Sequence, residues 1–142
     1  MNYTDKELTI KTSEEFTHFK PVIEKLVKDE KLNNAVIVCW VPHEVASIVQ
    51  LGWEEGLLDD LKAFLKDTAP NGKWTKHDEP GTPFDKNFYE HIRTKLIGNV
   101  SMSFIIKDKQ LVIGQYQDLY FYSPVFKHKP EHKVICRILK LD

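Results

Sequence analysis

Three histidines, His43, His77 and His91, are the residues of this sequence whose chemistry could build a reactive site. Each lies at the end of an expected helix or strand, or in a loop beside one, where a side chain can leave the core. Three imidazoles can bind a divalent metal such as zinc and leave one position open for water or substrate. The three histidines are therefore a candidate catalytic and metal-binding set, although their wide spacing, taken alone, favours three unrelated residues.

Three further side chains could complete such a site. Asp60 could accept a hydrogen bond from the second ring nitrogen of a ligating histidine, or it could belong to a solvated helix face. Gln117 needs a polar partner if it points inwards, which makes it a candidate for binding a ligand; otherwise it belongs to the sheet surface. Trp74 shares the long segment 73–83 with His77, and long loops inside compact domains are often functional.

The elements that must position these residues follow from the spacing of apolar residues. Strands are expected where polar and apolar residues alternate or where an apolar run is short, and helices where apolar residues recur every three or four positions. The expected strands are 7–12, 35–42, 45–50 (where a helix is also compatible), 119–122 and 134–141. The expected helices are 21–28, 54–67 and 88–97.

Several details refine these elements. The run 35–42 is apolar on both faces, which is typical of a central strand covered from two sides. The pair Asn33-Asn34 is expected to end the first helix, and Gly98 to cap the last one. Residues 100–117 are expected to form a hairpin that turns near 107–110, with the return strand running through Gly114 to Gln117. Together these features predict an α+β fold with a mixed or antiparallel, sandwich-like sheet and about three helices.

Length and charge exclude several classes of protein. A chain of 142 residues fits one domain, residues 1–142, because a core of this size buries roughly two-thirds of the unfolded surface. A formal net charge of −1 lacks the basic footprint that nucleic acid requires. The sequence has no apolar run near the roughly 20 residues of a membrane span and opens with a polar segment, so we expect a cytoplasmic protein without membrane contact.

Two cysteines, Cys39 and Cys136, lie within apolar runs. Buried free thiols are the simpler interpretation, and a disulfide between two strands would need an oxidising compartment. His128 and His132 are expected to lie in a polar turn.

The order of several segments resembles the YjbQ family of small uncharacterised proteins, also described as secondary thiamine-phosphate synthases. The resemblance covers nearly the whole chain. It is carried by the strand that ends at His43 and by the segments EEGLLDDLKAFLKDTAPNG, WTKHDEPG, EHIRTKLIGNVSMSF and LVIGQYQDLYF. It implies a compact α+β fold, a homotrimer and a site near subunit boundaries with the histidines at its centre.

The resemblance also implies an activity, namely a transferase that joins a pyrimidine diphosphate to a thiazole phosphate. Such a reaction would use a divalent metal (zinc or magnesium) or cationic donors for a small phosphorylated ligand, and an aromatic face for the pyrimidine. The sequence departs from the family at Glu44-Val45, where the family usually has Thr-Thr or Thr-Ser, and at 127–133, where the family is rich in arginine. The alternative is therefore a catalytically degenerate protein of the same fold that binds a small ligand or serves in assembly.

Overall fold

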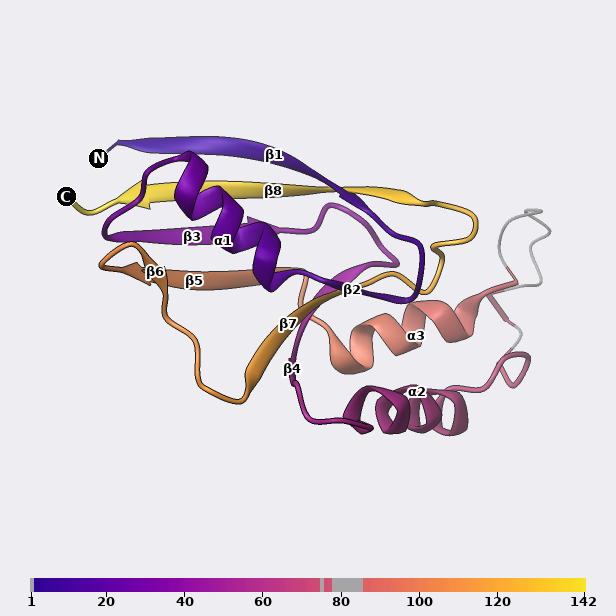
Figure 1. Ribbon diagram of the computed structural model, residues 1–142. Helices are drawn as coiled ribbons and strands as arrows, with labels where there is room; N and C mark the ends of the chain where they lie inside the picture. Colours follow the sequence, from indigo (N-terminus) through magenta and orange to yellow (C-terminus); the bar gives the residue numbers. More distant parts are fainter. Residues whose placement is uncertain (1, 75, 78–85) are drawn as a thin grey trace.

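Two antiparallel sheets form the body of the protein (Figure 1). The structure is a computed structural model, and it describes residues 2–74, 76–77 and 86–142. The larger sheet has the strand order β1 (Tyr3–Lys11), β8 (Glu131–Lys140), β3 (Ala35–Trp40), β5 (Ser101–Lys107) and β6 (Gln110–Leu111). The smaller sheet has the order β2 (Phe16–His18), β7 (Gln117–Tyr122) and β4 (Ser47–Gly52). Every strand pair is antiparallel, so the predicted α+β class is confirmed and its sheets are antiparallel rather than mixed.

Three helices accompany the sheets in the described part of the chain: α1 (Lys20–Asp29), α2 (Leu57–Thr68) and α3 (Phe88–Ile97). Helix α1 runs across the larger sheet, whereas α2 and α3 lie side by side near the smaller one (Figure 1). The apolar stripe of α1, made of Ile23, Leu26 and Val27, packs into the same core as the inward residues of β3 and β8. No helix within these residues is long and apolar enough to cross a membrane.

The first helix covers the predicted residues 21–28 and ends before the pair Asn33-Asn34. Helix α1 stops at Asp29, and Lys31 then takes a left-handed backbone conformation with φ of 52°. The pair Asn33-Asn34 has a different role, because both side-chain amides donate to the Asp142 carboxylate, at 2.7 and 3.0 Å. These bonds fasten the start of β3 to the end of the chain.

Strand β3 is central in its sheet, but only one of its faces is covered within this chain. Cys39 and Ile37 are fully buried, whereas the alternate residues Val36 and Val38 are half-buried and Trp40 is 51% exposed. Ile105 of β5 pairs with Val36 on that second face and is 58% exposed. The prediction that β3 is covered on both sides is therefore wrong for the single chain. We call these residues (Val36, Val38, Trp40 and Ile105) the outer sheet face.

Helix α2 begins three residues later than the sequence predicts. Gly56, at φ of 82°, precedes it in the left-handed region that favours glycine, so Glu54 and Glu55 lie before the helix. The expected apolar stripe is also narrower, because Leu65 is buried while Phe64 is 53% exposed. Leu58 and Leu61 share the packing with Leu65 against the smaller sheet.

The hairpin of β5 and β6 turns where the sequence predicts. Asp108 and Lys109 both have positive φ, 51° and 68°, and the turn is held by a hydrogen bond from the Asp108 N–H to the Asn34 Oδ1 at 3.2 Å. The return strand, however, ends at Leu111. The segment from Gly114 leads instead into β7 of the other sheet, so the predicted continuation of this strand to Gln117 is wrong.

Candidate functional site

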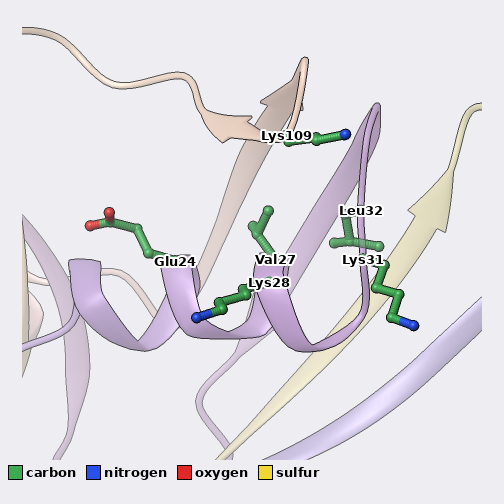
Figure 2. A pocket seen from close by; sticks show the side chains of 6 residues that line it. All are labelled: Glu24, Val27, Lys28, Lys31, Leu32 and Lys109. Carbon is green, nitrogen blue, oxygen red and sulfur yellow. The ribbon is translucent and has the colours of Figure 1, made fainter.

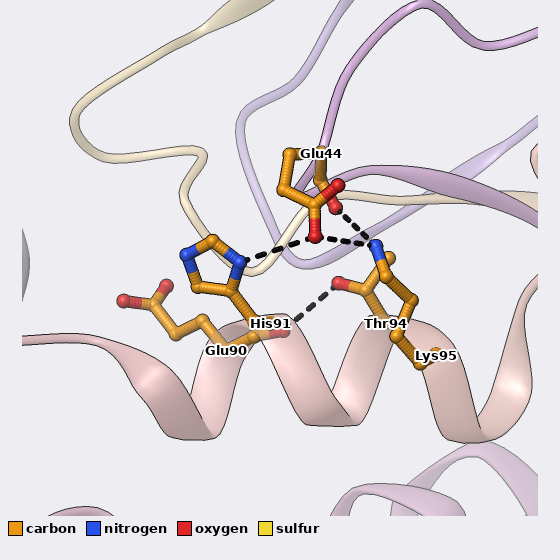
Figure 3. Close-up of polar contacts among 5 residues, drawn as sticks. All are labelled: Glu44, Glu90, His91, Thr94 and Lys95. Carbon is orange, nitrogen blue, oxygen red and sulfur yellow. Dashed lines mark hydrogen bonds and ion pairs between the residues drawn. The ribbon is translucent and has the colours of Figure 1, made fainter. Parts of the chain in front are cut away.

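Helix α3 places His91 and Lys95 one turn apart on the same face, toward the segment that follows β3 (Figure 3). The Glu44 carboxylate of that segment lies between them. Its Oε1 is 3.4 Å from His91 Nδ1 and 2.9 Å from Lys95 Nζ, and Lys95 Nζ also donates to the Glu44 backbone carbonyl at 2.9 Å. One carboxylate thus joins an imidazole and an ammonium group from one helix.

These contacts are electrostatically favourable but accessible to water. The hydrogen bonds from Lys95 and then His91 lower the pKa of Glu44 below its usual value. The Glu44 side chain is nevertheless 65% exposed, and that of Lys95 is 45% exposed. Each exposed ion pair contributes about 1 kcal/mol or less to stability, so the Glu44 carboxylate is held weakly and can be displaced by a ligand.

His77, another of the three predicted histidines, lies beside His91 on this surface. The rings of His77 and His91 are 4.7 Å apart between centroids, and the Phe88 ring lies 6.2 Å from that of His77. Trp74 packs edge-on against Phe88 at 6.0 Å. Two imidazoles therefore adjoin an aromatic wall. We call Glu44, His77, His91 and Lys95 the His91 site, with Trp74 as its aromatic neighbour.

His43 makes its contacts with other elements. The Lys133 backbone N–H donates to its Nε2 at 2.9 Å, and Lys129 Nζ is 3.2 Å from its Nδ1. Burial and the charge of Lys129 lower the pKa of His43. The adjacent residues His43 and Glu44 therefore reach opposite ways, one to the start of β8 and the other to α3.

The two remaining predicted residues lie outside the contacts of the His91 site. Asp60 is exposed in the first turn of α2. Gln117 begins β7 on the smaller sheet and is exposed, and its Oε1 accepts a hydrogen bond from the Gly114 N–H at 2.8 Å. Because that hydrogen bond stabilises a local turn, the Gln117 side chain has a structural role.

The described residues contain no group of three histidine, cysteine, aspartate or glutamate side chains placed to bind a metal ion. His77, His91 and Glu44 offer suitable donor atoms, but His43 is engaged with Lys129 and Lys133. The part of the chain that the structure describes therefore does not fit a resident metal by itself.

Two parts of the site were missing from the sequence predictions. Glu44 stands out in the sequence only as a departure from the family pattern, and Lys95 was not among the predicted site residues. The signal for Lys95 was its position four residues after His91, on the same helix face. No local signal could have placed Glu44, because its contact depends on the path of the chain after β3.

His132 also differs from its prediction as part of a polar turn. It is the second residue of β8, and only 2% of its surface is exposed. Its ring packs edge-on against His43 at 4.9 Å, and its Nε2 lies 3.5 Å from the Ser123 Oγ. Because inward and outward residues alternate along β8, this histidine belongs to the core face of its strand.

A different cavity, of about 440 Å³, lies between α1 and the turn of the β5–β6 hairpin (Figure 2). Lys28, Lys31 and Lys109 line it, and their ammonium groups point in different directions. This surface shares no residue with the His91 site. The three lysines do not converge on one position, so this cavity lacks the arrangement of donors that an anion-binding site needs.

The fold and this site define a small antiparallel α+β protein with a histidine-containing polar surface. A family model described as "UPF0047 protein YjbQ-like" matches residues 6–140. The chain belongs to this YjbQ-like UPF0047 family. A UPF0047 protein of Archaeoglobus fulgidus is 29% identical over 135 residues, which cover 94% of this chain and 99% of the relative.

Solved structures agree with this assignment. A YjbQ-like protein of unknown function from Sulfolobus solfataricus superposes with a TM-score of 0.79 at 20% identity and covers 98% of both chains. An uncharacterised protein of the same family from Clostridium acetobutylicum has a TM-score of 0.75 at 25% identity, covering 94% of this chain and 99% of the other. The resemblance seen in the sequence is therefore confirmed for family and fold.

Proposed function

We propose that the His91 site binds a small phosphorylated ligand with an aromatic part. The observation that carries this proposal is the carboxylate of Glu44 held by both His91 Nδ1 and Lys95 Nζ. A phosphate oxygen placed there would meet the same two groups, and Lys is an effective partner for phosphate as a point charge. The ring pair of Trp74 and Phe88 supplies an apolar face for the rest of the ligand.

Glu44 competes with the ligand in this arrangement. Its carboxylate must leave the pair before a phosphate can enter, because two anions cannot share the same donors without repulsion. Since the Glu44 side chain is largely exposed, it can swing into water at low cost. The affinity for the ligand then depends on how much more strongly its phosphate binds His91 and Lys95 than the Glu44 carboxylate does.

Phenyl phosphate, which combines an aromatic ring with a phosphate, is a suitable probe for isothermal titration. We expect Lys95→Ala to weaken its binding at least tenfold and Glu44→Gln to tighten it. Lys66→Ala, which removes an exposed ammonium group on α2, is the matched control and leaves binding unchanged. Equal affinity in the wild-type and Lys95→Ala proteins would remove the proposed site.

The transferase activity implied by the family resemblance is the alternative. In that reaction a carbon–nitrogen bond forms between the pyrimidine and thiazole parts, the bond to the diphosphate oxygen breaks, and pyrophosphate leaves. The separate positions of Asp60, Gln117 and His43 favour ligand binding without this transfer. An assay with both precursors distinguishes the two functions, since turnover that His91→Ala abolishes would establish the enzyme.

The divalent metal stays a separate prediction. Elemental analysis of the purified protein and its melting temperature with added zinc or magnesium test it directly. Bound zinc that His77→Ala and His91→Ala each release would support a metal role that includes residues beyond those described. An unchanged melting temperature without bound metal would end that role and leave the phosphate proposal intact.

The predicted homotrimer is also part of the proposal. The outer sheet face presents Trp40 and Ile105, each more than half exposed, beside the half-buried Val36 and Val38. Large apolar side chains gathered on one sheet face favour contact with another protein surface. A second copy of the chain is the partner that the family resemblance implies, and covering this face would give β3 the two buried sides that its sequence predicts.

A further inference from the structure

A groove runs along helix α1, between the helix and the free edge of the larger sheet. It consists of two adjoining cavities of about 440 and 310 Å³, which share the lining residues Glu24, Val27 and Lys109. The helix and the segment that follows it form one wall, and residues 109–111 with Ile113 form the other (Figure 2). We call it the α1 groove, and none of its residues belongs to the His91 site.

Strand β6 is the last strand of its sheet, so one side of it has no partner strand in the part of the chain that the structure describes. Leu111 lies opposite Ile106, and the Val112 N–H donates to the Ile105 carbonyl at 2.9 Å. Alternate residues of a strand direct their backbone groups to opposite sides, so Leu111 and Ile113 point theirs away from β5. Both residues line the groove, and the Ile113 N–H and C=O have no backbone partner among the described residues. This edge therefore offers free donors and acceptors to another strand.

The α1 groove is lined by more positive than negative charge. Its charged lining residues are one carboxylate, that of Glu24, and four lysines, namely Lys20, Lys28, Lys31 and Lys109. None of these four ammonium groups forms an ion pair within the described residues. Three of them are seen in Figure 2 to point in different directions. They therefore suit several carboxylates spaced along a chain, rather than one compact anion.

The dimensions of the groove fit a short extended chain. Helix α1 has 10 residues and is about 15 Å long, which matches about five residues of a β-strand. Side chains of such a strand would point alternately toward α1 with its lysines and toward the opposite side of the sheet. On that opposite side the cross-strand neighbours Val112 and Ile105 are 56% and 58% exposed. A strand in which acidic and apolar residues alternate would match both sides.

We propose that the α1 groove binds an extended acidic peptide, which pairs with the free edge of β6 as an additional strand. Its backbone forms hydrogen bonds with Leu111 and Ile113, its carboxylates face Lys28 and Lys109, and its apolar side chains lie beside Val112. In recognition of this kind the main-chain hydrogen bonds provide affinity and the alternate side chains provide specificity. A basic peptide would instead meet the lysines with like charge.

The peptide acetyl-Glu-Val-Glu-Val-Glu-amide is a suitable probe, and NMR titration of the intact protein measures its binding. We expect saturable shifts of the Leu111 and Ile113 amide signals, with hydrogen exchange of the Ile113 amide slowed at least tenfold at saturation. The same peptide with lysine in place of glutamate should bind at least tenfold more weakly. Because these amides lie outside the His91 site, this readout is independent of any ligand bound there.

Methylation of the peptide backbone separates strand pairing from charge attraction and leaves the protein unchanged. Only alternate amides of a bound strand face β6. N-methylation of one alternate set, either the glutamates or the valines, should therefore abolish binding, whereas N-methylation of the other set should preserve it. An affinity that neither methylation changes would overturn the proposal.

Substitution of exposed lysines tests the contribution of charge. A protein that carries both Lys28→Gln and Lys109→Gln should bind the acidic peptide at least tenfold more weakly. Lys66→Gln, at an exposed lysine of α2, is the matched control and leaves binding unchanged. All three side chains are exposed, so the melting temperatures should stay near that of the wild-type protein. No saturable binding by the wild-type protein, an unchanged affinity in the double variant, or equally tight binding of the lysine peptide would overturn the proposal.

Discussion

Cys39 and Cys136 face each other across strands β3 and β8, with their sulfur atoms 2.9 Å apart and both side chains fully buried. Both are free thiols, as the simpler of the two sequence interpretations expects. The hydrogen bond between them and their burial raise the pKa of the Cys39 thiol. Since the thiolate is the reactive form, the raised pKa disfavours nucleophilic chemistry at Cys39, and burial shields both thiols from reagents in the folded protein.

We therefore expect both thiols to resist alkylation until the protein unfolds. In iodoacetamide labelling at pH 8, followed by mass spectrometry, the native protein should react at the rate of global unfolding. The same protein in guanidinium chloride should add two labels within minutes. Rapid labelling of Cys39 or Cys136 under native conditions would contradict the buried pair.

His132 predicts a loss of stability in mild acid. Burial, with the nearby His43 and Lys129, lowers its pKa from 6.5 to about 4. As the pH falls below about 6.5, the His132 ring takes up a proton in the unfolded chain, whereas in the folded protein it stays neutral until the pH nears 4. Stability is therefore complete above about pH 6.5 and falls as the pH approaches 4, by up to about 3 kcal/mol from this residue.

Urea unfolding at a series of pH values measures this effect. His132→Gln removes the titrating ring, so its free energy of unfolding should fall less between pH 7 and pH 4 than that of the wild-type protein. His128→Gln, an exposed histidine before the same strand, should follow the wild-type curve. Parallel curves for wild-type and His132→Gln proteins would show that His132 is not the group responsible.

Gly98 is the C-terminal cap of α3, as the sequence predicts, and a close approach rather than a left-handed conformation requires glycine there. Its φ is −115°, which any residue can adopt, but a Cβ there would lie 1.8 Å from the Ser47 Oγ. Gly98→Ala should therefore destabilise the protein by about 1–3 kcal/mol, because Ser47 is buried and has little room to move.

A double-mutant cycle read by chemical denaturation checks this steric cause. Ser47→Gly in the Gly98→Ala background should recover part of the lost stability, because it removes the clashing atoms. The two substitutions would then be non-additive. Purely additive losses would mean that the cost of alanine at position 98 has another origin.

The outer sheet face predicts how the proposed trimer can be disrupted. Ile105→Glu places a charge among apolar residues of that face, and we expect light scattering after size-exclusion chromatography to show a monomer. Phe64→Glu, at an equally exposed apolar residue of α2, is the matched control and should leave assembly unchanged. A wild-type protein that is monomeric at high concentration would rule out the trimer itself.

Local patterns in the sequence determined most of the elements. Helix α3 has the predicted bounds, Phe88–Ile97, because apolar residues at helical spacing follow Asn87 and precede Gly98. The turn at Asp108 and Lys109 likewise lies within the predicted hairpin. Such features depend on neighbours along the chain, so periodicity and turn chemistry contain the necessary information.

Only the tertiary structure decided which polar side chains meet. His43 and Glu44 are adjacent in sequence, yet one contacts Lys133 and the other contacts His91. Likewise, the register of β8 against β1, which pairs His132 with Ile10, and the packing around it bury His132, although the sequence around it is polar. The spacing of apolar and polar residues predicts which side chains of one helix or strand are exposed. Contacts between distant elements depend instead on strand order, register and helix placement. Those are properties of the whole packed core, and no local segment encodes them.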